Sequence, residues 1–131
     1  MARLTGIGGV FFKAQDPKAL ADWYRDKVGL EIGEDGSVVF AWSDDPQKGG
    51  TGHTIWGPFD STTCYFDPSE KPFMINFRVD DLDAMLTQLR DAGVTVMDAE
   101  DHAPYGRFGW FMDPEGNKIE LWEPPDTAPI S

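Results

Sequence analysis

Hydrophobic and polar positions follow two periods along the chain, and the same order of periods occurs twice. Gly8 to Lys13 reads as a strand, and apolar side chains at helical spacing follow over residues 17–28. Residues 73–79 then alternate apolar with polar positions, as in a half-buried strand. A second apolar stripe at helical spacing comes next, formed by Leu82, Met85, Leu86 and Leu89. The pattern predicts two copies of one strand–helix unit.

Both predicted helices carry start and stop signals. Asp16 is a good N-cap residue, and Pro17 follows it at the first helical position, where a missing N–H has no cost. Asp81 takes the matching place in the second copy. Gly29 and Gly93 stop the two helices, because glycine readily adopts the left-handed conformation that ends a helix.

Shorter strands complete each copy. In the first, Asp35-Gly36 is a strong two-residue turn signal, which predicts a hairpin between Glu31-Ile32 and residues 37–42. A polar loop over residues 44–52 leads to a final strand over residues 53–56. In the second copy the predicted strands are 94–97, 108–112 and 118–122. The order β-α-β-β-β, found twice, predicts an α+β fold.

The two copies span residues 6–58 and 72–124 of what we expect to be a single domain, residues 1–131. Each closes on the same Trp-x-Pro pattern, at Trp56 and at Trp122. A repeat of this length is a duplicated supersecondary unit rather than a solenoid array. Two such units facing each other would form a cleft, which Tyr65 and Phe66 of the connector could fold back over, and which Tyr105 could contact.

Composition narrows the partners. The chain has 131 residues, with 11 Lys and Arg against 23 Asp and Glu, for a net charge of −12. This charge argues against nucleic acid or an anionic membrane as partner and favours neutral or cationic ligands, although it also serves solubility. The single Cys64 excludes an intramolecular disulfide. The N-terminus lacks an apolar signal region, so we expect a cytoplasmic protein.

The segment 111–124, with the turn Asp113-Pro114-Glu115-Gly116-Asn117 before Ile119-Glu120-Leu121, resembles the end of the second module in the vicinal oxygen chelate superfamily. This superfamily includes glyoxalase I, extradiol dioxygenases and bleomycin-resistance proteins. The resemblance covers residues 6–124, including Trp23-Tyr24 and Gly29-Leu30 in the first copy. It implies two βαβββ modules in a cupped mixed sheet (the glyoxalase/bleomycin resistance/dihydroxybiphenyl dioxygenase fold), often in a homodimer.

The resemblance also implies where a divalent metal would bind, on the first and last strands of each module. The matching positions here are Gly9, Thr54, Met74 and Glu120. Only Glu120 is a credible ligand, and one carboxylate does not hold a catalytic metal. His53 is adjacent to Thr54 and would face the cleft only if the register were shifted by one residue. His102 falls in a predicted exposed loop. We therefore predict the scaffold without its metal and without another cofactor.

Strand parity then predicts which side chains face the cleft. Those in phase with the ligand positions mix aromatic and polar groups, as ligand pockets do. The phases of Phe40, Phe108 and Trp110 stay open. The aromatic side chains also suit an ordinary core or a dimer interface. The predicted ligand-binding residues are Phe11, Trp56, Met74, Asn76, Arg78 and Trp122, with Lys13 and Lys118 also in phase.

Glu120 is the candidate catalytic residue. Burial without a metal would raise its pKa, which suits a general acid or base or the binding of a cation. A structural salt bridge is the alternative. The chain is thus predicted to be a metal-free, glyoxalase-like small-molecule-binding protein for an aromatic or cationic compound. The alternatives are a divalent-metal-dependent lyase, isomerase or dioxygenase of the glyoxalase type, and an interaction module with an aromatic homodimer seam.

Overall fold

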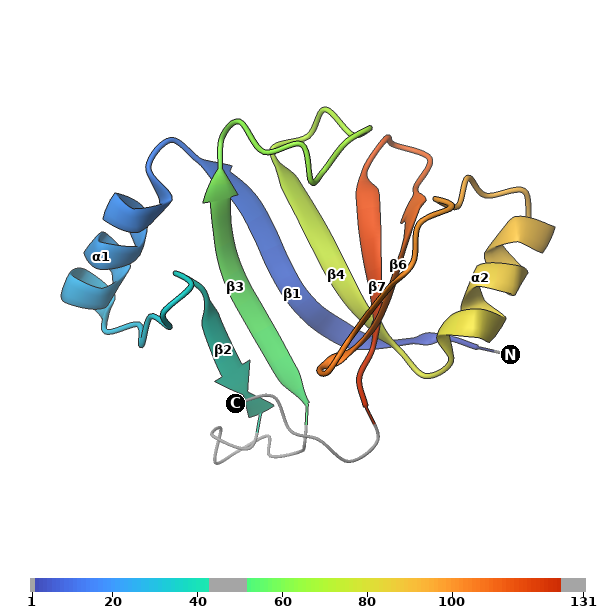
Figure 1. Ribbon diagram of the computed structural model, residues 1–131, viewed down its shortest axis with the longest axis horizontal. Coiled ribbons are helices and arrows are strands. Elements are labelled where there is room, and N and C mark those ends of the chain that lie inside the picture. Colours follow the sequence, from blue (N-terminus) through green and yellow to red (C-terminus); the bar gives the residue numbers. More distant parts are fainter. Residues whose placement is uncertain (1, 43–51, 126–131) are drawn as a thin grey trace.

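A computed structural model describes residues 2–42 and 52–125 of the protein. Seven strands form one mixed sheet in the order β2-β3-β1-β4-β7-β6-β5. The sheet curves into a half-barrel, and the helices α1 and α2 lie outside it at opposite ends (Figure 1). This arrangement confirms the predicted cupped α+β fold.

The first module holds one end of the sheet. Its strand β1 pairs in parallel with β3, and β3 pairs antiparallel with the short edge strand β2. The elements are β1 (Leu4–Ala14), α1 (Pro17–Val28), β2 (Val38–Ala41) and β3 (His53–Asp60).

The second module repeats this order of pairing. Its strand β4 pairs in parallel with β7, and β7 pairs antiparallel with β6, which carries β5 at the edge. β1 and β4 pair antiparallel and join the modules within one chain. The elements are β4 (Phe73–Val79), α2 (Leu82–Asp91), β5 (Asp101–Ala103), β6 (Gly106–Met112) and β7 (Lys118–Glu123).

The predicted helix starts are confirmed. The Asp16 carboxylate accepts a hydrogen bond from the Ala19 N–H at 3.0 Å, and the Asp81 carboxylate accepts one from the Ala84 N–H at 3.0 Å. Each bond satisfies an N–H group that has no partner within its helix. α1 ends at Gly29, whose φ of 78° is left-handed.

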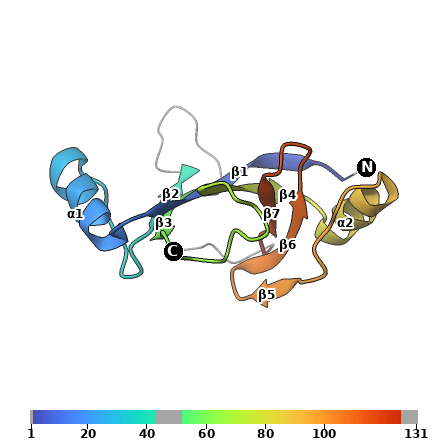
Figure 2. The ribbon, with the colours of Figure 1, turned by 90° about the horizontal axis from the view of Figure 1, so that it is seen from above.

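The larger apolar core lies between α2 and the outer face of the second module (Figure 2). Leu82 and Leu121 are fully buried there, with Phe77 and Phe111 packed around them. Alternation along β4 and β7 sends Phe77 and Leu121 outward, as the period of two predicts. Within the described part of the chain, no helix has the length and apolar character needed to cross a membrane.

Two predicted strands are absent or reduced. Residues 31–32 are not a strand, so the hairpin prediction was wrong there. The Asp35 carboxylate instead accepts hydrogen bonds from the N–H and hydroxyl of Ser37. Such side-chain bonds stabilise a local turn, which competes with strand pairing. Residues 94–97 contribute a single bridge, Val96 to Phe111. Most of the predicted 44–52 loop lies outside the described residues.

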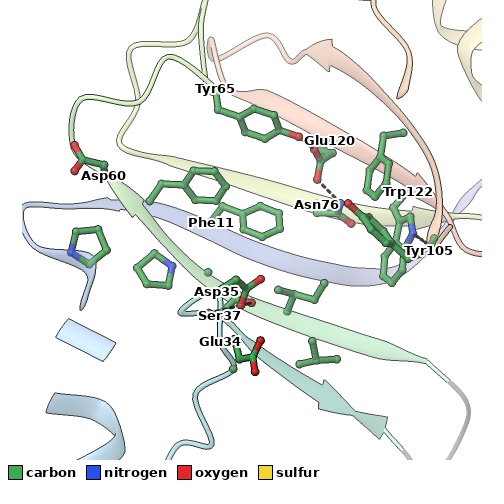
Figure 3. A pocket seen from close by; sticks show the side chains of 18 of the residues that line it. Phe11, Glu34, Asp35, Ser37, Asp60, Tyr65, Asn76, Tyr105, Glu120 and Trp122 are labelled. Atoms are coloured by element: carbon green, nitrogen blue, oxygen red, sulfur yellow. Dashed lines mark hydrogen bonds between the residues drawn. The ribbon is translucent and has the colours of Figure 1, made fainter. Parts of the chain in front are cut away.

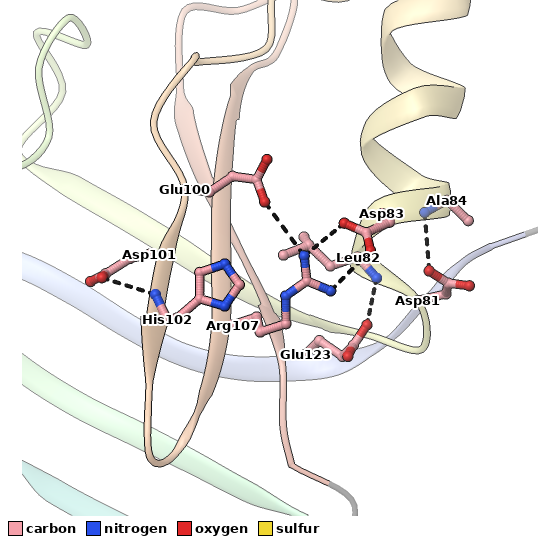
Figure 4. A network of polar contacts seen from close by, with 9 residues as sticks. All are labelled: Asp81, Leu82, Asp83, Ala84, Glu100, Asp101, His102, Arg107 and Glu123. Atoms are coloured by element: carbon pink, nitrogen blue, oxygen red, sulfur yellow. Dashed lines mark hydrogen bonds and ion pairs between the residues drawn. The ribbon is translucent and has the colours of Figure 1, made fainter.

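His102 lies in the edge strand β5 and not in a loop as predicted. Its neighbour across the strand pair is Arg107, which holds Asp83 of α2 through two hydrogen bonds of 2.7 and 3.1 Å (Figure 4). Glu123 accepts a hydrogen bond of 2.7 Å from the Leu82 N–H at the start of the same helix. These contacts fasten α2 to the sheet and point away from the cleft.

Candidate functional site

A cavity of about 1030 Å³ lies on the concave face, between the two modules. Strands β1, β3, β4 and β7 supply its base, and the segments before β2 and after β3 supply its rim (Figure 3). The volume is that of a pocket for a small organic molecule. Its floor is formed by Phe11, Ile55, Asn76, Glu120 and Trp122.

One row of paired residues crosses the four central strands. Gly9 pairs with Ile55 on one side and with Asn76 on the other, and Asn76 pairs with Glu120. Paired residues share a face of the sheet, so this row runs across the base of the cavity. The row places Glu120, near the end of the sequence, one strand away from β1, with Asn76 of β4 between them.

Glu120 is almost fully buried, with 2% of its surface exposed, and three donors surround its carboxylate. Oε2 accepts hydrogen bonds from the Tyr65 hydroxyl at 2.5 Å and the Trp110 indole N–H at 2.9 Å. Oε1 accepts one from the Asn76 side-chain amide at 2.6 Å. Desolvation raises the pKa of Glu120, and these hydrogen bonds oppose that rise. The carboxylate is held in place by the protein itself.

Tyr65 forms one aromatic wall, and it is held at both ends. The Lys118 ammonium donates a hydrogen bond of 2.8 Å to the Tyr65 carbonyl, while the hydroxyl donates to Glu120. The Tyr65 ring stacks on Phe59 with centroids 5.5 Å apart and planes inclined by 10°. Burial, followed by the nearby Glu120 charge, raises the pKa of Tyr65, so its hydroxyl remains a donor. The predicted return of Tyr65 over the cleft is seen.

Trp122 and Phe108 form a second aromatic wall. Their rings are stacked, with centroids 6.4 Å apart and an interplanar angle of 3°. The Trp122 indole N–H donates to the Tyr105 carbonyl at 2.8 Å, which fixes the ring and links it to the rim. Trp122 is 2% exposed and backs Phe108, so the partly exposed rings of Phe108 and Tyr65 are the surfaces on which a flat ligand could stack.

Four predicted site residues come together at the cavity: Phe11, Asn76, Glu120 and Trp122. Trp56 does not join them. It packs on the other side, against Tyr24 and Phe12, and Ile55 lines the cavity in its place. The prediction for β3 was therefore wrong by one residue. The pairing of Ile55 with Gly9 puts Ile55 on the cavity face, and its neighbour Trp56 then points to the opposite face.

Met74 and Arg78 also lie outside the cavity lining. Met74 is fully buried in a cluster with Phe66 and Trp110, against which the cavity residues Phe11 and Phe59 pack. The Arg78 guanidinium lies over the Trp42 ring, 5.0 Å from its centroid. The ligand-binding roles proposed for these residues stay predictions.

The donor set of the row does not fit a divalent metal. Gly9 and Ile55 have no ligand atom, and an amide and one carboxylate are left at Asn76 and Glu120. Thr54, the predicted ligand position, donates its hydroxyl proton to the Ile7 carbonyl. Among the described residues, no three His, Cys, Asp or Glu side chains gather closely enough to hold a metal ion. His53 does not line the cavity.

The acidic rim was missed from the sequence. Glu34 and Asp35 line the cavity from the segment before β2, and Asp60 does so from the end of β3 (Figure 3). Glu31 lines it from the same segment as Glu34. The excess of acidic residues was visible, but no periodicity placed these four together. The turn signal at Asp35 was the one available hint.

The comparisons with known proteins agree with this architecture. Residues 9–122 match the model of the Glyoxalase-like domain family. Methylmalonyl-CoA epimerase from Mycobacterium tuberculosis is 25% identical, with a TM-score of 0.60 over 93% of this chain and 89% of that one. The comparison with curated proteins returned no match.

Two further structures share the fold at lower identity. Methylmalonyl-CoA epimerase in complex with methylmalonyl-CoA and NH4+ is 21% identical, with a TM-score of 0.65 over 98% of this chain and 100% of that one. A glyoxalase/bleomycin resistance protein/dioxygenase superfamily member from Vibrio splendidus 12B01 is 11% identical, with a TM-score of 0.57 over 94% of this chain and 99% of that one.

The half-barrel sheet with a cleft between paired modules defines the glyoxalase-type class of proteins. The chain belongs to the Glyoxalase-like domain family within that class.

Proposed function

We propose that this protein binds a small aromatic or cationic molecule in the cleft between its modules, without a metal ion. The observation that carries the proposal is the cavity of about 1030 Å³ with two stacked aromatic pairs in its lining. Rigid aromatic walls with a few polar groups are typical of small-molecule sites. The polar groups here come from Asn76, Glu120 and the rim.

The engagement of Glu120 supports the metal-free part of the proposal. Both of its oxygens accept hydrogen bonds from protein donors. A metal ion at this carboxylate would have to displace at least one donor and would find no second carboxylate in the row. This arrangement does not favour the metal-dependent lyase, isomerase or dioxygenase reactions.

Elemental analysis and a binding screen together test the proposal. We expect purified protein to carry much less than one equivalent of Ni, Zn, Mn or Fe. We also expect ligands found by quenching of tryptophan fluorescence to bind Phe59→Ala about tenfold more weakly, because a wall of the cavity is removed. Phe12→Ala, which packs against Trp56 on the other face, is the matched control.

Stoichiometric metal would contradict the metal-free proposal. Equal loss of affinity in the Phe59 and Phe12 variants would contradict the cavity as the binding site. Homodimer formation and a cytoplasmic location stay predictions from the sequence and the family resemblance.

A further inference from the structure

We infer that the ligand of this cavity is a cation rich in N–H donors, with an aromatic body between the walls and its charged end toward the acidic rim and Asn76. This inference rests on the proposed function and narrows the ligand class. It also predicts that anionic ligands are rejected.

The charge of the lining is one-sided. Four carboxylates stand at the rim, and no Lys or Arg is found among the described residues that line the cavity. Lys13 and Lys118, which we expected on the cleft face, are not among the lining residues. Their ammonium groups lie over the rings of Phe66 and Tyr65, and Lys118 is on the cleft side, behind the Tyr65 wall. Because the described lining carries four rim carboxylates and no lysine or arginine, its field favours a ligand with positive charge.

Two rim carboxylates are held as anions by their local turns. Asp35 accepts hydrogen bonds from the Ser37 N–H and hydroxyl, and Asp60 accepts the same pair from Thr62. These bonds lower the pKa of each carboxyl. Each bond set uses Oδ1 only, so Oδ2 is available to a ligand among the described contacts.

The hydrogen-bond inventory points to the same ligand. The Tyr65 hydroxyl and the Trp122 indole N–H both donate to protein acceptors, and Ser37 donates to Asp35. By contrast, Asn76 is 2% exposed and lines the cavity, yet its Oδ1 has no partner in the described structure. This oxygen is enclosed beside Gly8, and a buried acceptor without a partner is costly. A ligand donor that drew the amide toward the cavity would therefore be favourable. The cavity therefore presents hydrogen-bond acceptors, which a ligand with hydrogen-bond donors would pair.

The ligand preference inferred for this cavity is opposite to that of a site that binds a ligand with several negative charges. The epimerase structure with the same fold contains methylmalonyl-CoA. A CoA thioester carries several phosphate charges, and the four rim carboxylates would repel them. The shared fold therefore does not carry the same ligand class.

Three flat probes of one size separate charge from shape. The aminoacridine is the 9-amino isomer, which is a cation at neutral pH, whereas acridine is neutral and acridine-9-carboxylate is an anion. We expect calorimetry at low salt to give aminoacridine about tenfold tighter binding than acridine, with the carboxylate and propionyl-CoA weaker than both. Added salt should reduce the preference for the cation.

Variants place the charge effect at the rim. The double variant Glu31→Gln with Glu34→Gln should weaken aminoacridine binding about two- to tenfold and leave acridine binding unchanged. Glu115→Gln, at an exposed turn remote from the cavity, is the matched charge control. Asn76→Leu should weaken aminoacridine more than acridine, because its acceptor is lost while Glu120 keeps two other donors.

The inference is overturned if aminoacridine does not bind, if the anionic probes bind as tightly as it does, or if the rim variants behave like Glu115→Gln. Equal binding of acridine and aminoacridine, with both lost in Phe59→Ala, would overturn the cation preference and leave the proposed aromatic cleft standing. If Phe59→Ala binds all probes as tightly as the wild type, the proposed function itself is overturned.

Discussion

The two modules have the same order of elements but bury very different amounts of their helices. In the second module, Leu82, Met85 and Leu86 of α2 are all buried against the sheet. In the first, Ala21 is the buried residue of α1, and Trp23 remains 51% exposed. The apolar core is therefore concentrated in the second module.

The cleft side shows the complementary difference. β4 and β7 place the buried side chains of Asn76, Glu120 and Trp122 on it. On β1 and β3 the glycines Gly9 and Gly57 leave room, and a Cβ at Gly57 would lie 2.8 Å from the Phe11 ring. The two copies of one pattern therefore contribute different features. The second module supplies the packed core and the fixed polar base of the cavity, and the first supplies space and the acidic rim.

The largest expected effect tests whether the apolar core is concentrated under α2 of the second module. Met85→Ala should lower the free energy of unfolding by about 2–5 kcal/mol, because it opens a cavity in a buried cluster. Leu20→Ala, at the matching position of the half-exposed first helix, should cost less than about 1.5 kcal/mol. Denaturant unfolding measures both. Equal losses would show that the first helix is as important to the core as the second.

The next prediction sharpens the contrast between Glu120 and the rim. Burial raises the pKa of Glu120, so the folded protein binds more protons than the unfolded chain between the two pKa values. Its contribution to the free energy of unfolding therefore rises as the pH falls through the folded pKa and is lost as the pH rises, by at most about 1.4 kcal/mol per pH unit.

Glu120→Gln should remove this dependence, so wild type should gain stability relative to the variant on acidification. Unfolding curves at a series of pH values measure the difference. Asp35→Asn, at the rim, should give the opposite sign, because hydrogen bonds from Ser37 lower the pKa of the Asp35 carboxyl and their contribution is lost as the pH falls. A wild type that loses stability relative to Glu120→Gln on acidification would mean that the hydrogen bonds from Tyr65, Asn76 and Trp110 outweigh desolvation.

The smallest expected effect compares the two helix caps. Asp81→Ala and Asp16→Ala each remove a hydrogen bond to a free helix N–H, at a cost of about 1 kcal/mol. Because α2 covers the core, we expect Asp81→Ala to lower global stability. Asp16→Ala should mainly speed amide hydrogen exchange in the first turn of α1. Loss of global stability in both variants to the same extent would argue against unequal modules.

The sequence by itself determined the elements whose signals are local. The Asp16 and Asp81 caps, the helical stripes and the alternation over residues 73–79 act within a few residues, so periodicity and capping rules predicted them. The motif over residues 111–124 carried the family and, with it, the cupped sheet. The prediction that Glu120 is the one credible metal ligand among the four matched positions also followed from the sequence.

Only the tertiary structure decided which residues share the cleft. A register irregularity in β1 between Ile7 and Gly9 sets the pairing of Gly9 with Asn76, so Asn76 and not Met74 joins Gly9 in the row at the cavity base. A one-residue shift on β3 likewise exchanged Ile55 for Thr54, and strand faces reverse with each such step. The Tyr65 hydrogen bond to Glu120 and the acidic rim bring together residues far apart in sequence. Periodicity and capping act over a few residues, so they cannot predict such contacts.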